Sequence, residues 1–376
     1  MNTDNTFKNK RILITGVCGT VGNELLRQLS VLEGNGPNEI VGLDNNESSL
    51  FFLDQEYLAD ARVNLAVVDV RDARSVAKQM KDIDIVFHAA ALKHVILSER
   101  SPDQAVQTNI IGVQNVIDAA ESNGVEKVIF TSSDKAVNPT NVMGTSKLMG
   151  ERLMTAANSG RQSSGTIYAS TRFGNVLGSN GSVFPIFRNQ IQQGGPITIT
   201  DSEMTRFVMS IEESVRLVLD TAKVALGGEI FVTKMPVVRI IDLAKAMIEI
   251  FAPQFGHNPR DIEITTIGTK PGEKLYEELM SDEETRRSIE LERYFAVLPA
   301  FRGVYKRIDY QYSDTVSLVV DDPYDSSRQS TLDVPQIITL LEEYDLTGQV
   351  KVKSDLAQSK RYWPGDKEDQ TLETVT

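Results

Sequence analysis

The feature that most constrains the fold of this chain is a regular alternation of short apolar runs and amphipathic segments between residues 11 and 178. The apolar runs have the length and composition of buried strands, and they read RILITG, EIVGLD, VNLAVVDV, DIVFHAAA, VEKVIFTSS and GTIYASTRFGNV. Segments with helical spacing separate them, including a long one at 101–124 with a serine near its start and a glycine at its end. Strands joined by helices run parallel, because the helix provides the crossover connection. The alternation therefore predicts an α/β fold with a doubly wound parallel sheet.

A glycine triplet follows the first predicted strand. TGVCGTVG places Gly16, Gly19 and Gly22 between that strand and the next helix, with the spacing G-x-x-G-x-x-G rather than the commoner G-x-G-x-x-G. Glycines there permit a tight turn and let backbone N–H groups approach a pyrophosphate at the helix N-terminus. The triplet alone is weak, because glycines also simply end strands. Its place between strand and helix, with Asp44 ending the next strand, indicates a Rossmann-type dinucleotide site.

Asp44 also bears on which dinucleotide binds. A carboxylate there can accept hydrogen bonds from both adenosine ribose hydroxyls and would repel a 2′-phosphate. The sequence DNNES that follows offers no arginine or lysine for such a phosphate, so we expect NAD rather than NADP. The alternatives are that Asp44 is a loop or helix-cap residue, and that DVRD is a solvated turn rather than a neighbour of the adenine. The predicted cofactor-binding residues from this part of the chain are Gly16, Gly19, Thr20, Val21, Gly22, Asp44, Asp69, Val70, Ala89, Ala90 and Ala91.

The chain divides into three predicted parts. We expect residues 1–178 to form the NAD-binding Rossmann domain, with segments around 205–250 returning to it. Residues 179–300 are predicted to form mainly a smaller α/β substrate-binding domain. Residues 301–376 are an extension that is partly irregular, although VPQIITLLEEY could form a helix and the last residues should fray.

Composition excludes several classes of protein. The net charge of −13 argues against a nucleic-acid partner, because phosphate backbones are bound by basic surfaces. Cys18 is the single cysteine, which excludes internal disulfides and cysteine metal sites, and three histidines make a histidine-rich metal site unexpected. The N-terminal residues lack the apolar core of a secretory signal, and no apolar run approaches the roughly 18 residues of a membrane span. These features predict a soluble cytoplasmic protein without a metal.

Several longer strings resemble one superfamily. TGxxGxxG, HAAALKHV, TSSDK and the small-residue helix that carries Lys147 resemble the extended short-chain dehydrogenase/reductases. SSDKAVNPTN, RFGNVLGSNGSVFPIF, TRFVMS and KPGEKLYEEL are similar to the nucleotide-sugar 4,6-dehydratases of bacterial polysaccharide and glycoprotein biosynthesis that act on UDP-N-acetylglucosamine. The resemblance covers roughly residues 8–299.

The resemblance implies a redox-neutral reaction on a UDP-sugar. Bound NAD⁺ would take a hydride from C4, water would leave across C5 and C6, and the hydride would return to C6, giving a 4-keto-6-deoxy sugar. In the family's pattern Ser133 hydrogen-bonds the C4 oxygen and Asp134 protonates the departing C6 hydroxyl. Lys135 stands where the base that abstracts the C5 proton stands, and Lys147 where a lysine binds the nicotinamide ribose.

One position departs from the superfamily's pattern. Met143 stands four residues before Lys147, where a tyrosine usually serves as the base for hydride removal, and a thioether has no proton to exchange. One interpretation is a lost activity. The other interpretation is that the chain resembles a branch of these dehydratases that also has methionine at this position. In that branch an aspartate is the best candidate to take the C4 hydroxyl proton and to deliver it to C6. We favour this second interpretation, in which Asp134 relays the proton and the C5 configuration is retained. For Lys135 to act as a base it must be neutral, and we expect burial beside Lys147 and NAD⁺ to lower its pKa.

Candidate substrate contacts follow the fourth strand and the motifs after residue 170. Two of the candidates have a specific alternative: Lys93 could be an ordinary surface lysine, and Arg172 in RFGNV could be a structural ion-pair partner rather than a ligand contact. Glu273 could hold one of the cations, and His88 and His94 are expected to be packed or surface residues rather than catalytic ones. The predicted substrate-binding residues are Lys93, Asn175, Asn180, Arg206 and Lys274.

Three other interpretations remain open from the sequence. A C5-inverting dehydratase shares the fold and the chemistry. A nucleotide-sugar 4-epimerase shares the fold and cofactor but needs no C5 base, so Lys135 beside Asp134 argues against it. A non-catalytic NAD- or nucleotide-sugar-sensing module is supported by Met143 alone. We also expect a homo-oligomer, at least a dimer, paired through the amphipathic helices DQAVQTNIIGVQNVIDAA and KLMGERLMTAA.

Overall fold

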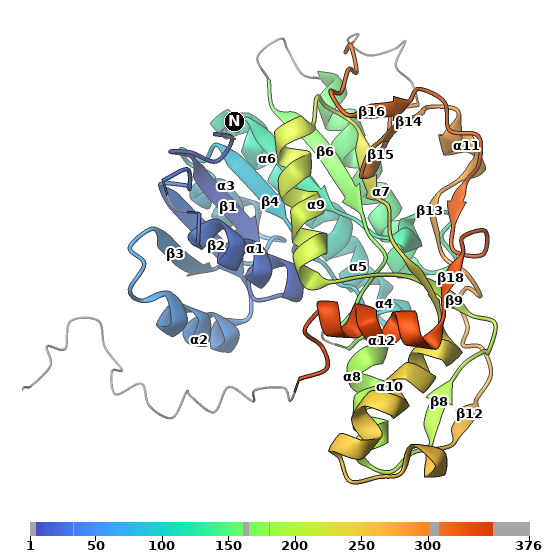
Figure 1. Cartoon of the computed structure of the whole chain (residues 1–376). Coiled ribbons are helices and arrows are strands. Elements are labelled where there is room, and N and C mark those ends of the chain that lie inside the picture. The colour runs from blue at the N-terminus through green and yellow to red at the C-terminus, as the bar shows by residue number, and fades with distance from the viewer. Residues whose placement is uncertain (1–4, 33, 161–164, 180, 301–307, 349–376) are drawn as a thin grey trace, which may run out of the picture.

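The computed structural model describes residues 5–32, 34–160, 165–179, 181–300 and 308–348 (Figure 1). A ten-stranded sheet forms its centre, and its first six strands run parallel in the order 3-2-1-4-5-6. The predicted doubly wound Rossmann-type sheet is confirmed. Across the sheet the strands are β3 (Val63–Val67), β2 (Glu39–Asp44), β1 (Arg11–Thr15), β4 (Ile85–His88), β5 (Lys127–Thr131), β6 (Ile167–Arg172), β10 (Ile230–Thr233), β15 (Tyr294–Val297), β14 (Ser288–Leu291) and β16 (Thr315–Ser317).

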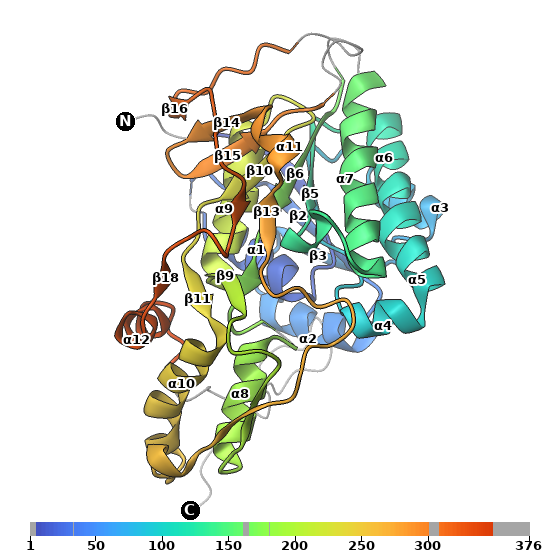
Figure 2. The same cartoon turned by 90° about the vertical axis from the view of Figure 1, so that its right-hand side faces the viewer.

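Helices cover both faces of this sheet. In Figure 2 one layer contains α3 (Ala73–Gln79), α6 (Gly112–Asn123) and α7 (Val142–Gly160), and the opposite layer contains α1 (Thr20–Ser30) and α9 (Ile211–Val224). Strands β1, β4 and β5 are almost entirely buried because both of their faces are covered, which is why they read as continuous apolar runs. Helix α2 (Glu47–Tyr57) packs against β3 at the edge of the sheet.

The long helix predicted at 101–124 is helical but not uniformly α-helical. It consists of α5 (Pro102–Val106), a π-helical turn η1 (Gln107–Ile111) and α6, and it follows the short helix α4 (Val95–Arg100). The π turn places the buried Asn109 so that its amide bonds the backbone of Leu92 and the hydroxyl of Ser146. Apolar spacing does not distinguish one widened turn inside a helix, so the π-helical turn was not predicted.

The antiparallel edge of the sheet was not predicted. Strand β10 pairs parallel to β6, whereas β15, β14 and β16 continue antiparallel beyond it. These strands come from the region after residue 285, where short hairpin-like strands leave a weaker pattern than buried parallel ones. The neighbouring short elements are β13 (Glu278–Met280), α11 (Asp282–Thr285) and β17 (Tyr324–Asp325), and β13 pairs with β17.

A second, smaller core lies at one end of the sheet, below it in Figure 1. Helices α8 (Val183–Gln192), α10 (Ile240–Gln254) and α12 (Val334–Glu343) share it, and α12 is the helix predicted from VPQIITLLEEY. Buried Ile337 and Leu341 hold α12 there, and an Asp333–Gln336 capping box starts it. The accompanying strands and turns are β7 (Asn175–Val176), β8 (Ile197–Ile199), β9 (Thr205–Met209), β11 (Val237–Arg239), η3 (Pro259–Asp261), β12 (Ile264–Thr266) and β18 (Thr331–Leu332).

Within the described part of the chain no helix is both long enough and apolar enough to cross a membrane. The same residues contain no cluster of three or more histidine, cysteine, aspartate or glutamate side chains that could hold a metal ion.

Candidate active site

The glycine loop forms a tight turn between β1 and α1. Gly16 has a φ of 71°, and a Cβ on it would lie 2.7 Å from the backbone of Ala90, so the ends of β1 and β4 touch here. A Cβ on Gly22 would lie 2.1 Å from the carbonyl oxygen of Gly16. Helix α1 starts at Thr20, and no side chain caps its N-terminus at Gly19. Its first N–H groups are therefore available to an anion such as a pyrophosphate.

Asp44 lies at the carboxyl end of β2, directly beside this loop. Its carboxylate accepts hydrogen bonds from the backbone N–H of Cys18 at 3.0 Å and of Asn46 at 3.0 Å. The side chain thus connects the glycine loop to the carboxyl end of the second strand. Burial and the neighbouring Asp44 carboxylate raise the pKa of the Cys18 thiol to about 12, so this thiol stays protonated.

The next turn, after β3, contains Asp69 and Val70. Asp69 is held by the Arg71 guanidinium, which lowers the pKa of Asp69 to about 2 through its hydrogen bonds. Val70 is buried, and its carbonyl accepts a bond from Asn115 of α6. These contacts fix the turn. Asn45 lies 3.4 Å from Asp69, and its neighbour Asp44 contacts the glycine loop, so the turn and the loop lie at the same end of the sheet.

The TSSDK string forms the centre of the candidate site. Strand β5 ends at Thr131, and a single 3₁₀ turn η2 (Asp134–Ala136) follows it. Asp134 is almost fully buried, and its Oδ1 accepts hydrogen bonds from the Ser133 hydroxyl at 2.5 Å and from the Lys135 ammonium at 3.1 Å. An acid, a hydroxyl and an amine are therefore in direct contact.

The expectation of a lowered pKa for Lys135 is wrong. Burial alone would lower it, but the carboxylates of Asp134 and Glu277 outweigh that effect and raise the pKa above its usual value. Glu277 lies 3.5 Å from the Lys135 ammonium, in a segment of the chain that is distant in sequence. Lys135 is thus held in its charged form by its sequence neighbour Asp134 and by the distant Glu277.

Met143 and Lys147 lie in the first turns of α7. The Lys147 ammonium donates to the carbonyl of Thr131 at 2.9 Å and lies 4.7 Å from the centre of the Phe130 ring. Burial lowers the pKa of Lys147 to about 8. Met143 is buried at 3 % exposure. The second lysine is therefore fixed at the end of β5, whereas the methionine adds no proton donor beside it.

His88 lies buried beneath this group, at the end of β4. Its Nδ1 is 2.6 Å from the Thr15 hydroxyl, its ring stacks on Phe130, and burial lowers its pKa to about 3. The unfolded chain binds a proton at about pH 6.5, but the folded chain does not until pH 3. The free energy of unfolding should therefore fall by roughly 1.4 kcal/mol per pH unit on acidification through this window because of His88.

Denaturant unfolding of the wild type and of His88→Gln at several pH values would test this expectation. The variant should lose less stability between pH 6.5 and 3, while His94→Gln, at an exposed histidine, should follow the wild type. Parallel curves for the wild type and His88→Gln would contradict it.

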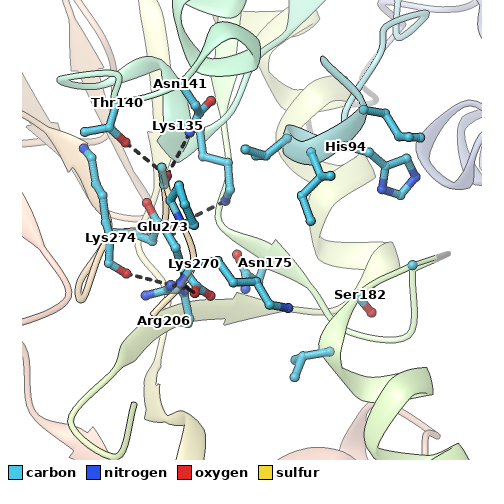
Figure 3. A pocket seen from close by; sticks show the side chains of 18 residues that line it. His94, Lys135, Thr140, Asn141, Asn175, Ser182, Arg206, Lys270, Glu273 and Lys274 are labelled. Carbon is cyan, nitrogen blue, oxygen red and sulfur yellow. Dashed lines mark hydrogen bonds and ion pairs between the residues drawn. The ribbon is translucent and has the colours of Figure 1, made fainter. Parts of the chain in front are cut away.

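Next to Lys135 the protein has a cavity of about 600 Å³ (Figure 3). Figure 3 shows Lys135 on the same side as the cations Arg206 and Lys274, with His94 and apolar side chains of α4 on the opposite side. The cavity therefore combines a cationic wall with an apolar wall. The lining residues are His94, Val95, Ile96, Leu97, Lys135, Thr140, Asn141, Asn175, Gly181, Ser182, Val183, Arg206, Lys270, Pro271, Gly272, Glu273, Lys274 and Glu277.

The structure brings most of the predicted substrate contacts to this cavity. Asn175, Arg206 and Lys274 line it, as does Glu273, whereas Lys93 is not among the lining residues. Asn180 lies outside the described residues. The sequence analysis did not predict a substrate contact for His94, Thr140, Asn141, Lys270 or Glu277, although all five belong to the strings HAAALKHV, SSDKAVNPTN and KPGEKLYEEL.

Arg206 and Lys274 are also structural. The Arg206 guanidinium donates to the carbonyl oxygens of Thr205, Lys274 and Leu275, and the Lys274 ammonium donates to the carbonyl of Val137. Thr140 and Asn141 both donate to the carbonyl of Gly272. These hydrogen bonds hold segment 270–278 against the loop that follows TSSDK, and the segment forms one side of the cavity.

Of the two alternatives for Arg172, ligand contact or structural ion-pair partner, the structure shows the ion-pair partner. It is 1 % exposed, and it pairs with Glu151 of α7 at 2.7 Å and with Glu284 of α11 at 2.9 Å. It is therefore an internal ion-pair partner and does not line the cavity.

The family model for polysaccharide biosynthesis proteins matches residues 12–299. The chain belongs to this family. The resemblance inferred from the motifs is thereby confirmed.

Two relatives and one solved structure show what the chain is similar to. It is 40 % identical to the UDP-N-acetylglucosamine 4,6-dehydratase (inverting) of Campylobacter jejuni, over 81 % of this chain and 87 % of the relative. It is 38 % identical to the UDP-glucose 4-epimerase of Rickettsia canadensis, over 89 % of this chain and 96 % of the relative. The X-ray structure of Pen from Bacillus thuringiensis superposes with a TM-score of 0.83 at 38 % identity, covering 90 % of this chain and 99 % of that chain.

Proposed function

We propose that the protein is an NAD-dependent nucleotide-sugar 4,6-dehydratase that acts on UDP-N-acetylglucosamine. The observation that carries the proposal is the direct contact of the buried Asp134 with Lys135, which lines a cavity that also has other cationic side chains. A 4,6-dehydration needs an acid–base group for the C4 and C6 oxygens and a separate base for the C5 proton. Asp134 and Lys135 supply this pair.

The residues around the glycine loop fit NAD. Gly16 allows close approach of a ligand at the junction of β1 and β4, and the uncapped N-terminus of α1 suits a pyrophosphate. Asp44 would bind the adenosine ribose and disfavour a 2′-phosphate, and the nearby Arg71 is already held by Asp69. Lys147 would bind the nicotinamide ribose. Bound NAD⁺ supplies the acceptor for the C4 hydride and afterwards the donor for C6.

Asp134 carries a proton between the two sugar oxygens. As the hydride leaves C4, the Asp134 carboxylate takes the proton of the C4 hydroxyl, whose oxygen the Ser133 hydroxyl contacts. Asp134 then gives this proton to the C6 hydroxyl, which departs as water. The carboxylate ends the cycle as it began, so Met143 need not exchange a proton at all.

Lys135 handles the proton at C5. The 4-ketone acidifies that hydrogen, and a neutral Lys135 amine removes it while the C6 oxygen leaves. When hydride reaches C6, the same ammonium returns a proton to C5. A single base acting from one face would retain the C5 configuration, and we propose retention, although the Campylobacter relative is named as inverting.

The cavity supports a UDP-sugar as the ligand. Lys270, Lys274 and Arg206 give one wall the positive charge that a diphosphate requires. The apolar wall of α4, with Ile96 and Leu97 half exposed, suits the acetyl methyl and the sugar faces.

A mass measurement separates this proposal from the epimerase alternative, which the Rickettsia relative favours. The purified protein is incubated with UDP-N-acetylglucosamine, and the products are separated and weighed. A dehydratase lowers the mass by one water, whereas a 4-epimerase gives an isomer of unchanged mass. Appearance of only the isomer, or of neither product with NAD⁺ supplied, would contradict the proposal.

Lys135→Met should lower product formation by about 10²–10³-fold, because general-base catalysis contributes on that order. Hydride removal from C4 does not need Lys135, so bound NADH should still form on mixing with substrate. Rapid-mixing absorbance measurements follow NADH, and mass spectrometry follows the product. Equal loss of both signals would show that Lys135 is required before elimination.

We also propose a homo-oligomer. Val106, Ile111 and Met149 lie on the helices predicted to pair and are 40–45 % exposed. Burying such side chains against a second copy would stabilise a dimer. Light scattering should give at least twice the monomer mass, and a monomer would contradict this.

A further inference from the structure

Glu277 is a buried carboxylate at the wall of the cavity. It is 3 % exposed, its Oε1 lies 3.5 Å from the Lys135 ammonium, and the same oxygen lies 3.6 Å from Nε of Arg206. Among the described residues its Oε2 has no hydrogen-bond partner and no access to solvent. A buried carboxylate oxygen without a partner is costly, and such groups in native proteins often have a chemical role.

The backbone around Glu277 is fixed on both sides. Its N–H donates to the Ser326 hydroxyl at 3.0 Å, and its carbonyl accepts from the Ser326 N–H at 2.9 Å. Arg206 holds the preceding residues through the carbonyls of Lys274 and Leu275. The carboxylate is therefore held beside Lys135 rather than swinging into solvent.

The proposed reaction leaves one proton without a destination. Lys135 is protonated because the carboxylates of Asp134 and Glu277 face it, and an ammonium cannot remove the C5 proton. Asp134 cannot take the extra proton, because at that stage it holds the proton of the C4 hydroxyl. The group that can is the other carboxylate in contact with Lys135.

We propose that Glu277 accepts the proton of Lys135 after the C4 hydroxyl has been oxidised, and so converts Lys135 into the base for C5. This inference rests on the proposed dehydratase function. In the step, one N–H bond of the Lys135 ammonium breaks and an O–H bond forms on Glu277, leaving a neutral amine and a neutral acid. After C5 has been reprotonated by Lys135, the proton on Glu277 returns to the amine, so no proton is gained or lost over the cycle.

The protonation state of Asp134 determines when Lys135 can pass its proton to Glu277. While Asp134 is ionised, its contact at 3.1 Å favours the charged form of Lys135. Once Asp134 has taken the C4 hydroxyl proton, that attraction is lost. The pKa of Glu277 loses the contribution of the Asp134 charge as well, but Asp134 acts on Lys135 through charge and a direct hydrogen bond and on Glu277 through charge alone, so proton transfer to Glu277 becomes easier. Lys135 therefore becomes basic only when the ketone that acidifies C5 is present.

The surroundings of Glu277 have opposing effects on its pKa. Burial and the charge of Asp134 raise its pKa, whereas the cations Lys135, Arg206 and Lys274 lower it, and the balance is a raised pKa. Glu273, 4.0 Å from Arg206, shares the charge of that guanidinium. Burial, which persists when Asp134 is neutral, favours a proton on Glu277, as an internal acceptor requires.

The test compares Glu277→Gln with Glu277→Asp by the rate of C5 deuterium exchange during turnover in D₂O, measured as a function of pH. Glu277→Gln should be slower by about 10²-fold near neutral pH, and its rate should rise about tenfold per pH unit, because Lys135 must lose its proton to solvent. The wild type should be flat over that range, because its proton moves internally. Glu277→Asp should restore the flat profile at a lower rate, and Glu283→Gln, at an exposed glutamate, should match the wild type.

NADH formation on mixing with substrate provides the second readout. It should stay within several-fold of the wild type in Glu277→Gln, because hydride removal precedes the step assigned to Glu277. A Glu277→Gln profile parallel to the wild type, or an equal loss of NADH formation, would overturn the inference alone. Absence of a dehydrated product from the wild type would overturn the proposed function and this inference together.

Discussion

Asp134→Asn should lower the formation of 4-keto-6-deoxy product by about 10³-fold or more, because one carboxylate serves two proton transfers and each contributes on the order of 10²–10⁴-fold. An amide keeps the size of the side chain and can still accept from the backbone N–H of Lys135, which lies 2.9 Å from Oδ1. It cannot take the C4 hydroxyl proton. Unlike Lys135→Met, this variant should therefore also fail to form NADH on mixing.

The measurement is steady-state turnover together with rapid-mixing NADH formation. Asp54→Asn, at an exposed aspartate of α2, is the matched control and should leave both unchanged. Turnover of Asp134→Asn at the wild-type rate would show that another group relays the proton.

Arg172→Met should destabilise the protein by roughly 3–5 kcal/mol, the usual cost of removing one partner from a buried ion pair. The guanidinium makes four hydrogen bonds to the carboxylates of Glu151 and Glu284. Without it both carboxylates are left in the interior, where Arg172 now lowers the pKa of Glu284 to about 2 against the effect of burial. Denaturant unfolding gives the change in free energy.

Two further variants make this test specific. The triple variant Arg172→Met, Glu151→Gln, Glu284→Gln should recover much of the loss, because no unpaired charge remains buried. Arg71→Met removes an exposed partner of Asp69 and should cost less than about 1 kcal/mol. Equal losses from Arg71→Met and Arg172→Met would contradict the role assigned to the buried cluster.

Local signals were sufficient to predict the parallel half of the sheet. Strands β1, β4 and β5 are buried on both faces and therefore appear as unbroken apolar runs. The glycine loop could be located because Gly16 needs a positive φ and has no room for a side chain. The roles of Asp134 and Lys135 came from the resemblance of TSSDK to a family and not from spacing alone.

The cavity's second wall could not be predicted in the same way. Glu277 and Lys135 are far apart in sequence, and tertiary hydrogen bonds bring their segments together, among them those of Gly272 with Thr140 and Asn141 and that of Lys274 with Val137. The wrong expectation for the pKa of Lys135 has this origin only in part, since it counted burial and Lys147 but neither the adjacent Asp134 nor the distant Glu277. Tertiary contacts decide such electrostatics, and a sequence pattern does not contain them.

The most direct test of the dehydratase mechanism is an NMR measurement of the wild-type protein with UDP-N-acetylglucosamine in D₂O, without added cofactor. The mechanism predicts a 4-keto-6-deoxy product that carries deuterium at C5 in the original configuration, because the Lys135 amine exchanges its protons with solvent before it returns one to the same face. Deuterium at C5 in the inverted configuration would keep the reaction but contradict a single base. A dehydrated product without deuterium at C5, or no dehydrated product even with NAD⁺ supplied, would contradict the mechanism itself.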